Sequence, residues 1–170
     1  MIIAKVNGYD NSILFTDYIL SRIIAKLRTR EALLFYVSDH GESLGETDDR
    51  GEVYWLHGKN ERIEQRMVPM QVWASDRFIT QYPDRFAMLK ARATASLSHD
   101  HFFHSVLDCV GIHSAAVDKR LSLCNQGSLT ERDQFFTVDS FGTVHPNTAM
   151  SGESGQKGTT RQIAAAVAPD

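Results

Sequence analysis

The sequence is poor in the features that mark several classes of protein. Its 170 residues include two cysteines and four prolines. No apolar run approaches the roughly 18 residues that a membrane span requires. The 18 basic and 21 acidic side chains give a net charge of −3, without a long basic stretch. Nucleic acid is therefore not an expected partner.

The amino-terminal residues also lack the features of a secretion signal. Met1–Lys5 is too short for the apolar core of such a signal, and no cleavage pattern follows it. We therefore expect a soluble chain with no export signal or membrane span of its own. The length and the 42% hydrophobic content suit one domain with a real core.

The two cysteines leave two interpretations open. Cys109 and Cys124 could form one disulfide in an oxidising compartment, or remain two buried thiols in a reducing one. Two cysteines are too few to identify the compartment.

The apolar pattern predicts helices interspersed with strands. Residues 9–12 offer capping side chains before a helical stripe that extends to Leu27. Ala32–Ser38 reads as a strand that is apolar on both faces, which favours a parallel sheet. A second strand is predicted at Val68–Ala74. Three further helices are predicted at residues 76–82, with Ser75 and Asp76 as the cap, at 84–95 and at 100–110. The last is predicted to end at Gly111 and to have an apolar side made of Phe102, Phe103, Val106, Leu107 and Val110.

The character of the chain changes after Cys124. Residues 125–170 are rich in Gly, Ser and Thr and have little periodic apolar pattern, although Phe135–Phe136 favours a short ordered piece. We expect disorder from Pro146 onward. The sequence thus predicts a domain at residues 1–124 followed by a poorly ordered tail at 125–170.

Asp39 and His40 follow directly on the first predicted strand. In open α/β sheets, ligands bind outside the carboxyl ends of the strands, and a carboxylate next to an imidazole suits Zn²⁺. His57, after a polar and acidic loop, could fold back over the same pocket. Alone, the pair is a weak signal, because many strands end in Asp and a neighbouring His often only hydrogen-bonds.

Other candidate residues have plainer interpretations. Ser43 lies in a Gly-x-Ser-x-Gly pattern, but the strand has already ended, so the context of a nucleophile is missing. Glu42 and Glu46 are interpreted as solvated loop acids, with support of a metal ligand as the alternative. Three further histidines are interpreted as packing or surface residues rather than a metal site: His99, His101 and His104.

Several segments together resemble the phosphoethanolamine transferases of the alkaline phosphatase/sulfatase superfamily. The resemblance covers about Asn7 to Cys124, with the segments in the family's order. The segments are Tyr9–Tyr18, Tyr36–Glu46, Tyr54–Gly58, Val68–Trp73 and Ser98–Leu107.

The resemblance implies a fold and a reaction. The fold would be α/β, a three-layer sandwich of alkaline phosphatase-like type, incomplete here, with a mainly parallel sheet and flanking helices. The reaction moves phosphoethanolamine from phosphatidylethanolamine, through a covalent threonine intermediate, to a lipid A or core-glycan acceptor. It takes place at the periplasmic face of the bacterial inner membrane, where Cys109 and Cys124 would form a disulfide.

The same resemblance assigns roles to three residues. Asp39 and His40 match the pair that binds the catalytic Zn²⁺, and His57 matches a histidine near the transferred phosphate. The family's threonine nucleophile, another acidic zinc ligand and the membrane helices lie upstream of the segment matched here. Thr16 and Thr29 do not replace the threonine, because they belong to a predicted helix.

We therefore expect a partial transferase whose 170 residues alone bind zinc weakly and have no measurable transferase activity. The missing strands would leave apolar edges prone to association. Two alternatives remain: a sulfatase- or phosphatase-type hydrolase, and a non-catalytic interaction module in which Asp39 and His40 only hydrogen-bond a turn.

Overall fold

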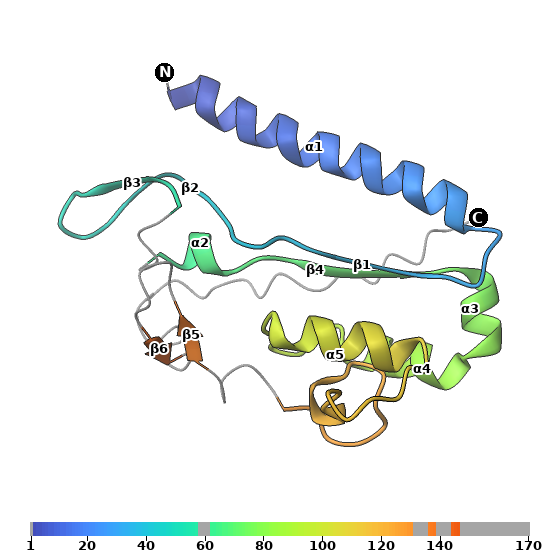
Figure 1. Cartoon of the computed structure of the whole chain (residues 1–170). Coiled ribbons are helices and arrows are strands. Elements are labelled where there is room, and N and C mark those ends of the chain that lie inside the picture. Colours follow the sequence, from blue (N-terminus) through green and yellow to red (C-terminus); the bar gives the residue numbers. More distant parts are fainter. Residues whose placement is uncertain (1, 58–61, 131–135, 139–143, 147–170) are drawn as a thin grey trace.

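The computed structural model describes residues 2–57, 62–130, 136–138 and 144–146 (Figure 1). The helices are α1 (Ile2–Leu27), α2 (Ile63–Arg66), α3 (Asp76–Gln81), α4 (Pro83–Ala91), α5 (Asp100–Cys109) and the short 3₁₀ helix η1 (Lys119–Leu121). The strands are β1 (Leu33–Val37), β2 (Ser43–Thr47), β3 (Val53–Leu56), β4 (Met70–Ala74), β5 (Phe136–Val138) and β6 (Val144–Pro146).

The two apolar strands predicted from the sequence, β1 and β4, pair with each other. The pairing is antiparallel, with Leu33 opposite Ala74 and Val37 opposite Met70. The sequence predicted a mainly parallel sheet, and this pair of strands does not follow that pattern. The chain turns back beyond the end of β1, through β2, β3 and α2, and re-enters the sheet from that same end (Figure 1). The mainly parallel three-layer sandwich stays a prediction for a complete domain.

Ser75 fixes the far end of the strand pair. Its Oγ accepts hydrogen bonds from the amides of Phe78 at 3.2 Å and Ala32 at 3.0 Å, and its own amide donates to the carbonyl of Ala32 at 3.0 Å. The predicted cap of α3 is thus confirmed, and the same side chain ties this cap to the start of β1.

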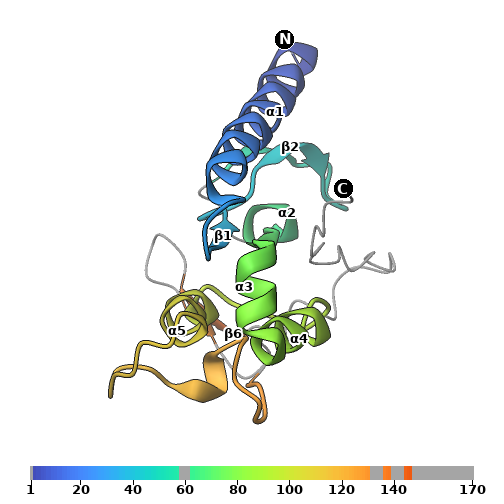
Figure 2. The same cartoon turned by 90° about the vertical axis from the view of Figure 1, so that its right-hand side faces the viewer.

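Helices lie on both sides of the β1–β4 pair. Helix α1 lies on one side, and α4 and α5 lie on the other, as two views at right angles show (Figures 1 and 2). Phe35 of β1 meets Phe102 of α5 edge to face, with ring centroids 6.2 Å apart. The buried core on this side consists of Met70, Leu89, Cys109, Leu123 and Cys124.

Helix α1 begins earlier than the capping residues suggested. It starts at Ile2, so residues 9–12 lie inside it, and Ser12 Oγ donates to the carbonyl of Tyr9 at 2.7 Å instead of capping. A serine that bonds back along the helix satisfies its hydroxyl without ending the helix. Six apolar side chains of this helix are exposed by 38 to 67%: Ile13, Leu14, Phe15, Tyr18, Ile19 and Ile23. No helix among the described residues is long and apolar enough to cross a membrane.

Helix α5 buries a more polar face than the spacing of its apolar residues predicted. Phe103 and Val110 of the predicted apolar face are about half exposed, whereas His101, Ser105 and Cys109 are fully buried. Polar contacts explain the difference, because Ser105 Oγ accepts from the amide of Leu123 at 3.0 Å. Gly111, with φ of +79°, follows the helix end as predicted.

Cys109 and Cys124 form a disulfide, which confirms the pairing that the family resemblance implied. Arg92 supports the same segment by donating to the carbonyls of Ser122 and, at 2.6 Å, Gly127. Residues up to Thr130 therefore pack against the domain. The predicted boundary at residue 124 remains a prediction, and the disorder predicted from Pro146 falls on residues 147–170, outside the described residues.

Replacing both Cys109 and Cys124 by serine should lower the free energy of unfolding by about 3 kcal/mol, the chain-entropy value for a loop of this size. Urea unfolding monitored by circular dichroism measures the change. A reducing agent should destabilise the unaltered chain by a similar amount and leave the double variant unchanged. Equal stability of both chains would show that the disulfide contributes nothing.

Candidate metal centre

The register of one hairpin brings Glu42 and His57 together. Strands β2 and β3 are antiparallel with Ser43 opposite Leu56, so Glu42, just before β2, faces His57, just after β3. His57 Nδ1 lies 2.6 Å from Glu42 Oε1. The sequence predicted a loop at Ser43–Thr47, and this strand corrects that prediction.

His40 reaches the same point from the end of β1. Its ring centroid lies 4.0 Å from that of His57, and its Nδ1 lies 3.8 Å from Glu42 Oε1. One ligand atom from each of His40, Glu42 and His57 falls within 4.8 Å of the others. The predicted approach of His57 to the Asp39–His40 segment is thus confirmed for His40, and the group of three side chains is a candidate metal centre.

Glu42 was interpreted as a solvated loop acid, and that interpretation is wrong. Its side chain is only 20% exposed. Its Oε2 atom is buried and accepts no hydrogen bond within the part of the chain that the structure describes. A buried carboxylate oxygen without a partner is costly unless a cation or a donor occupies its free side. The signal that sequence analysis missed was the hairpin register, which sets Glu42 against His57.

Asp39 lies beside this group rather than within it. Its side chain is 88% exposed, and its Oδ2 lies 3.8 Å from His40 Nε2. The His40 amide donates to its Oδ1 at 3.0 Å, and this hydrogen bond, with the nearby imidazole, lowers the pKa of the Asp39 carboxyl below its ordinary value. Asp39 is therefore a carboxylate at neutral pH, one residue away from His40.

The hairpin itself has unusual backbone conformations, two of them in its strands. Gly45 has φ of +106°, and a Cβ there would lie 2.8 Å from the ring of Trp55 on the partner strand. Leu56 adopts φ of 63°, in the left-handed region that costs a non-glycine residue about 1–2 kcal/mol. The strained turn directly precedes His57 and sets the direction in which the chain presents its ring.

The remaining histidines named by the sequence analysis have separate structural partners. His99 Nε2 lies 2.7 Å from the carbonyl of Ser38, and buried His101 has its Nε2 2.7 Å from the carbonyl of Thr130. His104 Nδ1 accepts from the amide of Asp118 at 3.0 Å. Their interpretation as packing and surface residues is confirmed. Ser43, fully buried in β2, accepts a hydrogen bond from Gln65, which agrees with rejecting it as a nucleophile.

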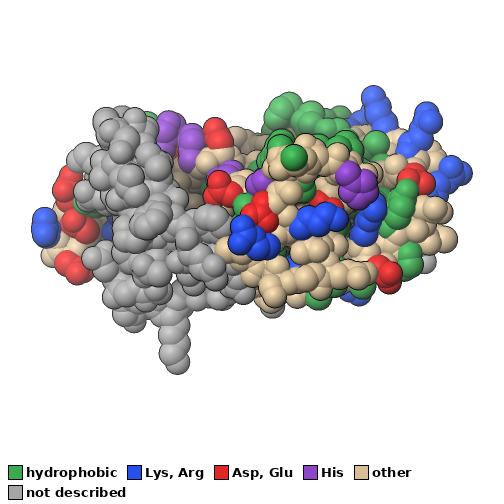
Figure 3. All heavy atoms as spheres, turned by 60° about the horizontal axis from the view of Figure 1, so that its bottom comes forward, with side chains coloured by type: hydrophobic (Ala, Val, Ile, Leu, Met, Phe, Trp, Pro, Cys, Tyr) green, Lys and Arg blue, Asp and Glu red, His purple; other side chains and the backbone are tan. Residues whose placement is uncertain are grey.

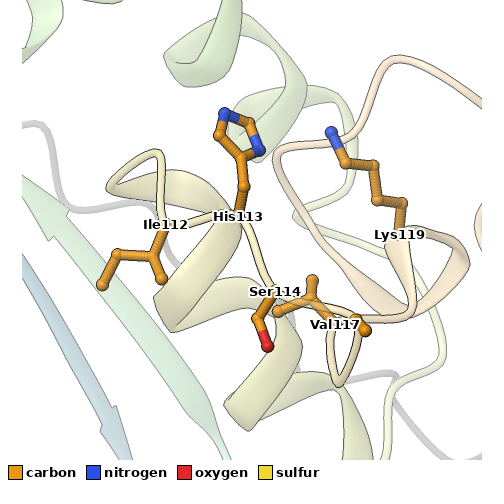
Figure 4. Close-up of a pocket in the computed structure, with 6 residues that line it drawn as sticks. Ile112, His113, Ser114, Val117 and Lys119 are labelled. Carbon is orange, nitrogen blue, oxygen red and sulfur yellow. The ribbon is translucent and has the colours of Figure 1, made fainter.

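The surface around these elements is mixed in charge. Figure 3 shows histidine side chains next to acidic ones on one face of the molecule, with basic side chains elsewhere on that face. A separate hollow opens between the end of α5 and η1, lined by Ile112, His113, Ser114, Val117 and Lys119 (Figure 4). None of the three grouped side chains lines this hollow.

Residues 3–112 match the sulfatase family, and the chain belongs to that family. It is 34% identical over 116 residues to the Kdo(2)-lipid A phosphoethanolamine 7''-transferase of Salmonella typhimurium, covering 64% of this chain and 20% of the relative. It is 41% identical over 78 residues to the phosphatidylethanolamine transferase Mcr-2 of Escherichia coli, covering 42% of this chain and 14% of that protein.

A solved structure shows the same fold. The C-terminal periplasmic domain of phosphoethanolamine transferase EptC from Campylobacter jejuni superposes with a TM-score of 0.60 at 32% identity. The superposition covers 77% of this chain and 41% of that domain. The alkaline phosphatase/sulfatase-like fold predicted from the sequence is therefore confirmed. The chain spans about a fifth or less of the length of the two curated relatives.

Replacing Gly41 by alanine should disrupt the candidate centre. A Cβ at Gly41 would clash with the backbone carbonyl oxygen of Glu64 in α2, so either the His40–Glu42 segment or α2 must move. We expect thermal unfolding at a clearly lower temperature. The control is Gly8→Ala in α1, where a Cβ meets nothing within 4 Å and alanine favours the helix. An unchanged melting temperature for Gly41→Ala would refute the close packing.

Proposed function

We propose that the chain is part of the catalytic domain of a zinc-dependent phosphoethanolamine transferase. In this proposal the donor is phosphatidylethanolamine, the acceptor is lipid A or a core glycan, and the site faces the periplasm. The names of the relatives and the periplasmic domain of the solved structure support this reading. The grouping of His40, Glu42 and His57 is the single observation in this chain that carries it.

The donor set fits Zn²⁺. The imidazole of His40 and the carboxylates of Asp39 and Glu42 are ligands that zinc takes, and the unpartnered Oε2 of Glu42 leaves acceptor capacity for a cation. We assign His40 and Asp39 as metal ligands, with Glu42 as a further ligand from the hairpin. His57 keeps the role of a catalytic residue close to the transferred phosphate. A bound Zn²⁺ would lower the pKa of a hydroxyl nucleophile and stabilise the charge of the phosphoryl group.

The side chains have distinct tasks in this site. Glu42 holds the imidazole of His57 through Nδ1, so that Nε2 of His57 is left to face a phosphoryl oxygen. When the ring is protonated on both nitrogens, Nε2 can donate a hydrogen bond or its proton to that oxygen. The side chains of His40 and His57 are 40% and 54% exposed, which leaves access for a lipid headgroup.

The two alternatives predict different behaviour. A sulfatase- or phosphatase-type hydrolase would use the same metal but pass the group to water. A non-catalytic module would need no metal, and Asp39 and His40 would only order the turn after β1. A test of metal binding distinguishes the non-catalytic module from the two enzymes. The identity of the acceptor, water or a lipid or glycan, distinguishes the hydrolase from the transferase.

Zinc binding should depend on the grouped side chains. Isothermal titration of the chain with Zn²⁺ should show one site, and His40→Ala, Asp39→Ala and His57→Ala should each weaken it, because each removes a ligand or its neighbour. His113→Ala, at the separate hollow, is the matched control and should bind normally. Unchanged binding in Asp39→Ala and His40→Ala would instead support the non-catalytic module.

The 170 residues by themselves should show no turnover, because no threonine in them matches the family's nucleophile. The assay follows release of diacylglycerol from fluorescent phosphatidylethanolamine in detergent micelles, with zinc present. A full-length relative serves as the positive control. Diacylglycerol formation by the chain alone, lost in His57→Ala, would overturn the expected inactivity.

A further inference from the structure

Gln65 holds both neighbours of Glu42. Its backbone carbonyl accepts a hydrogen bond from the amide of Gly41 at 2.8 Å, and its side-chain Nε2 donates to Ser43 Oγ at 2.7 Å. Gln65 is 3% exposed and Ser43 is fully buried. One residue thus fixes the chain immediately before and immediately after the carboxylate that faces His57.

The helical turn that carries Gln65 is too short to be stable without contacts to the rest of the protein. Helix α2 has four residues, and an isolated turn of that length is unstable in water. It is held against both strands of the hairpin. Arg62, at its start, lies 5.1 Å over the ring of Tyr54 in β3, while Gln65 bonds to Ser43 in β2. The turn therefore braces the open end of the hairpin, where Glu42 and His57 meet.

The burial of this amide is not explained by packing alone. Gln65 Oε1 is buried and accepts no hydrogen bond from the residues that the structure describes. A buried acceptor without a partner costs about 1–3 kcal/mol, whereas an apolar side chain of the same shape would avoid that cost. The hydrogen bond from Nε2, which holds Ser43, offsets part of this cost.

We propose that Gln65 is a positioning residue of the metal centre: it sets the Glu42 carboxylate against His57 without touching metal or substrate. The metal part of this inference rests on the proposed function. Partners that orient metal ligands typically contribute 10- to 100-fold in metal affinity. Gln65 fits that role because its two bonds leave the Glu42 backbone little freedom to rotate.

The test compares Gln65→Met, which keeps length and removes the donor, with Gln81→Met at an exposed position in α3 as the control. The first readout is Co²⁺ binding by the full chain. Gln65→Met should weaken Co²⁺ about 10- to 100-fold and change its visible absorption bands, while the metal-free chain melts at nearly the same temperature. Unchanged affinity and bands would overturn the proposal, as would a loss of affinity that only follows collapse of the metal-free fold.

A second readout needs no metal. In the metal-free chain, the ¹⁵N chemical shift of His57 Nδ1 reports its hydrogen bond to Glu42. Gln65→Met should move that signal and Gln81→Met should not. If the chain takes up no Co²⁺ but the signal moves, the proposed metal function fails and the positioning role stands. If the signal stays in place, the positioning role fails whatever the metal does.

Discussion

The candidate centre depends on one backbone register, the placing of Ser43 opposite Leu56. A shift by one residue would turn every side chain of β2 to the other face of the hairpin and separate Glu42 from His57. Three features protect the register: Gly45 accommodates the Trp55 ring, Leu56 accepts a left-handed conformation, and Gln65 holds Ser43. Each carries a conformational restriction or a burial cost, as expected where local structure serves a site rather than stability.

The rest of the described structure presents this hairpin to the end of β1. His40 follows the end of β1 in the β1–β4 pair, and the Ser75 cap fixes the other end of that pair. Helix α5, which carries one cysteine of the disulfide, packs against one face of the pair. Apolar surface is left exposed on α1, and every residue of β1 is only partly buried. A strand of five apolar residues usually has both faces covered. The partial exposure of β1 agrees with the finding that this chain superposes on 41% of a larger periplasmic domain.

The sequence predicted the parts that local patterns encode. The apolar run of β1, the Ser75 cap and the Gly111 helix end each follow from residue types over a few positions. Strand direction was not predictable, because a strand that is apolar on both faces looks the same whether its neighbour is parallel or antiparallel. Strand β2 was missed because Ser-Leu-Gly-Glu-Thr has little strand propensity and is stabilised by pairing with β3. The contact of Glu42 with His57 depends on that pairing, so support of a metal ligand by Glu42 was only the alternative interpretation.

The most direct test of the metal centre is anomalous diffraction at the zinc absorption edge from crystals of the chain grown with Zn²⁺. We predict one strong peak bounded by His40, Glu42 and His57, with Asp39 turned toward it. A peak only at other histidines, such as His99 or His113, or no peak at millimolar zinc, would show that these side chains do not form a metal centre.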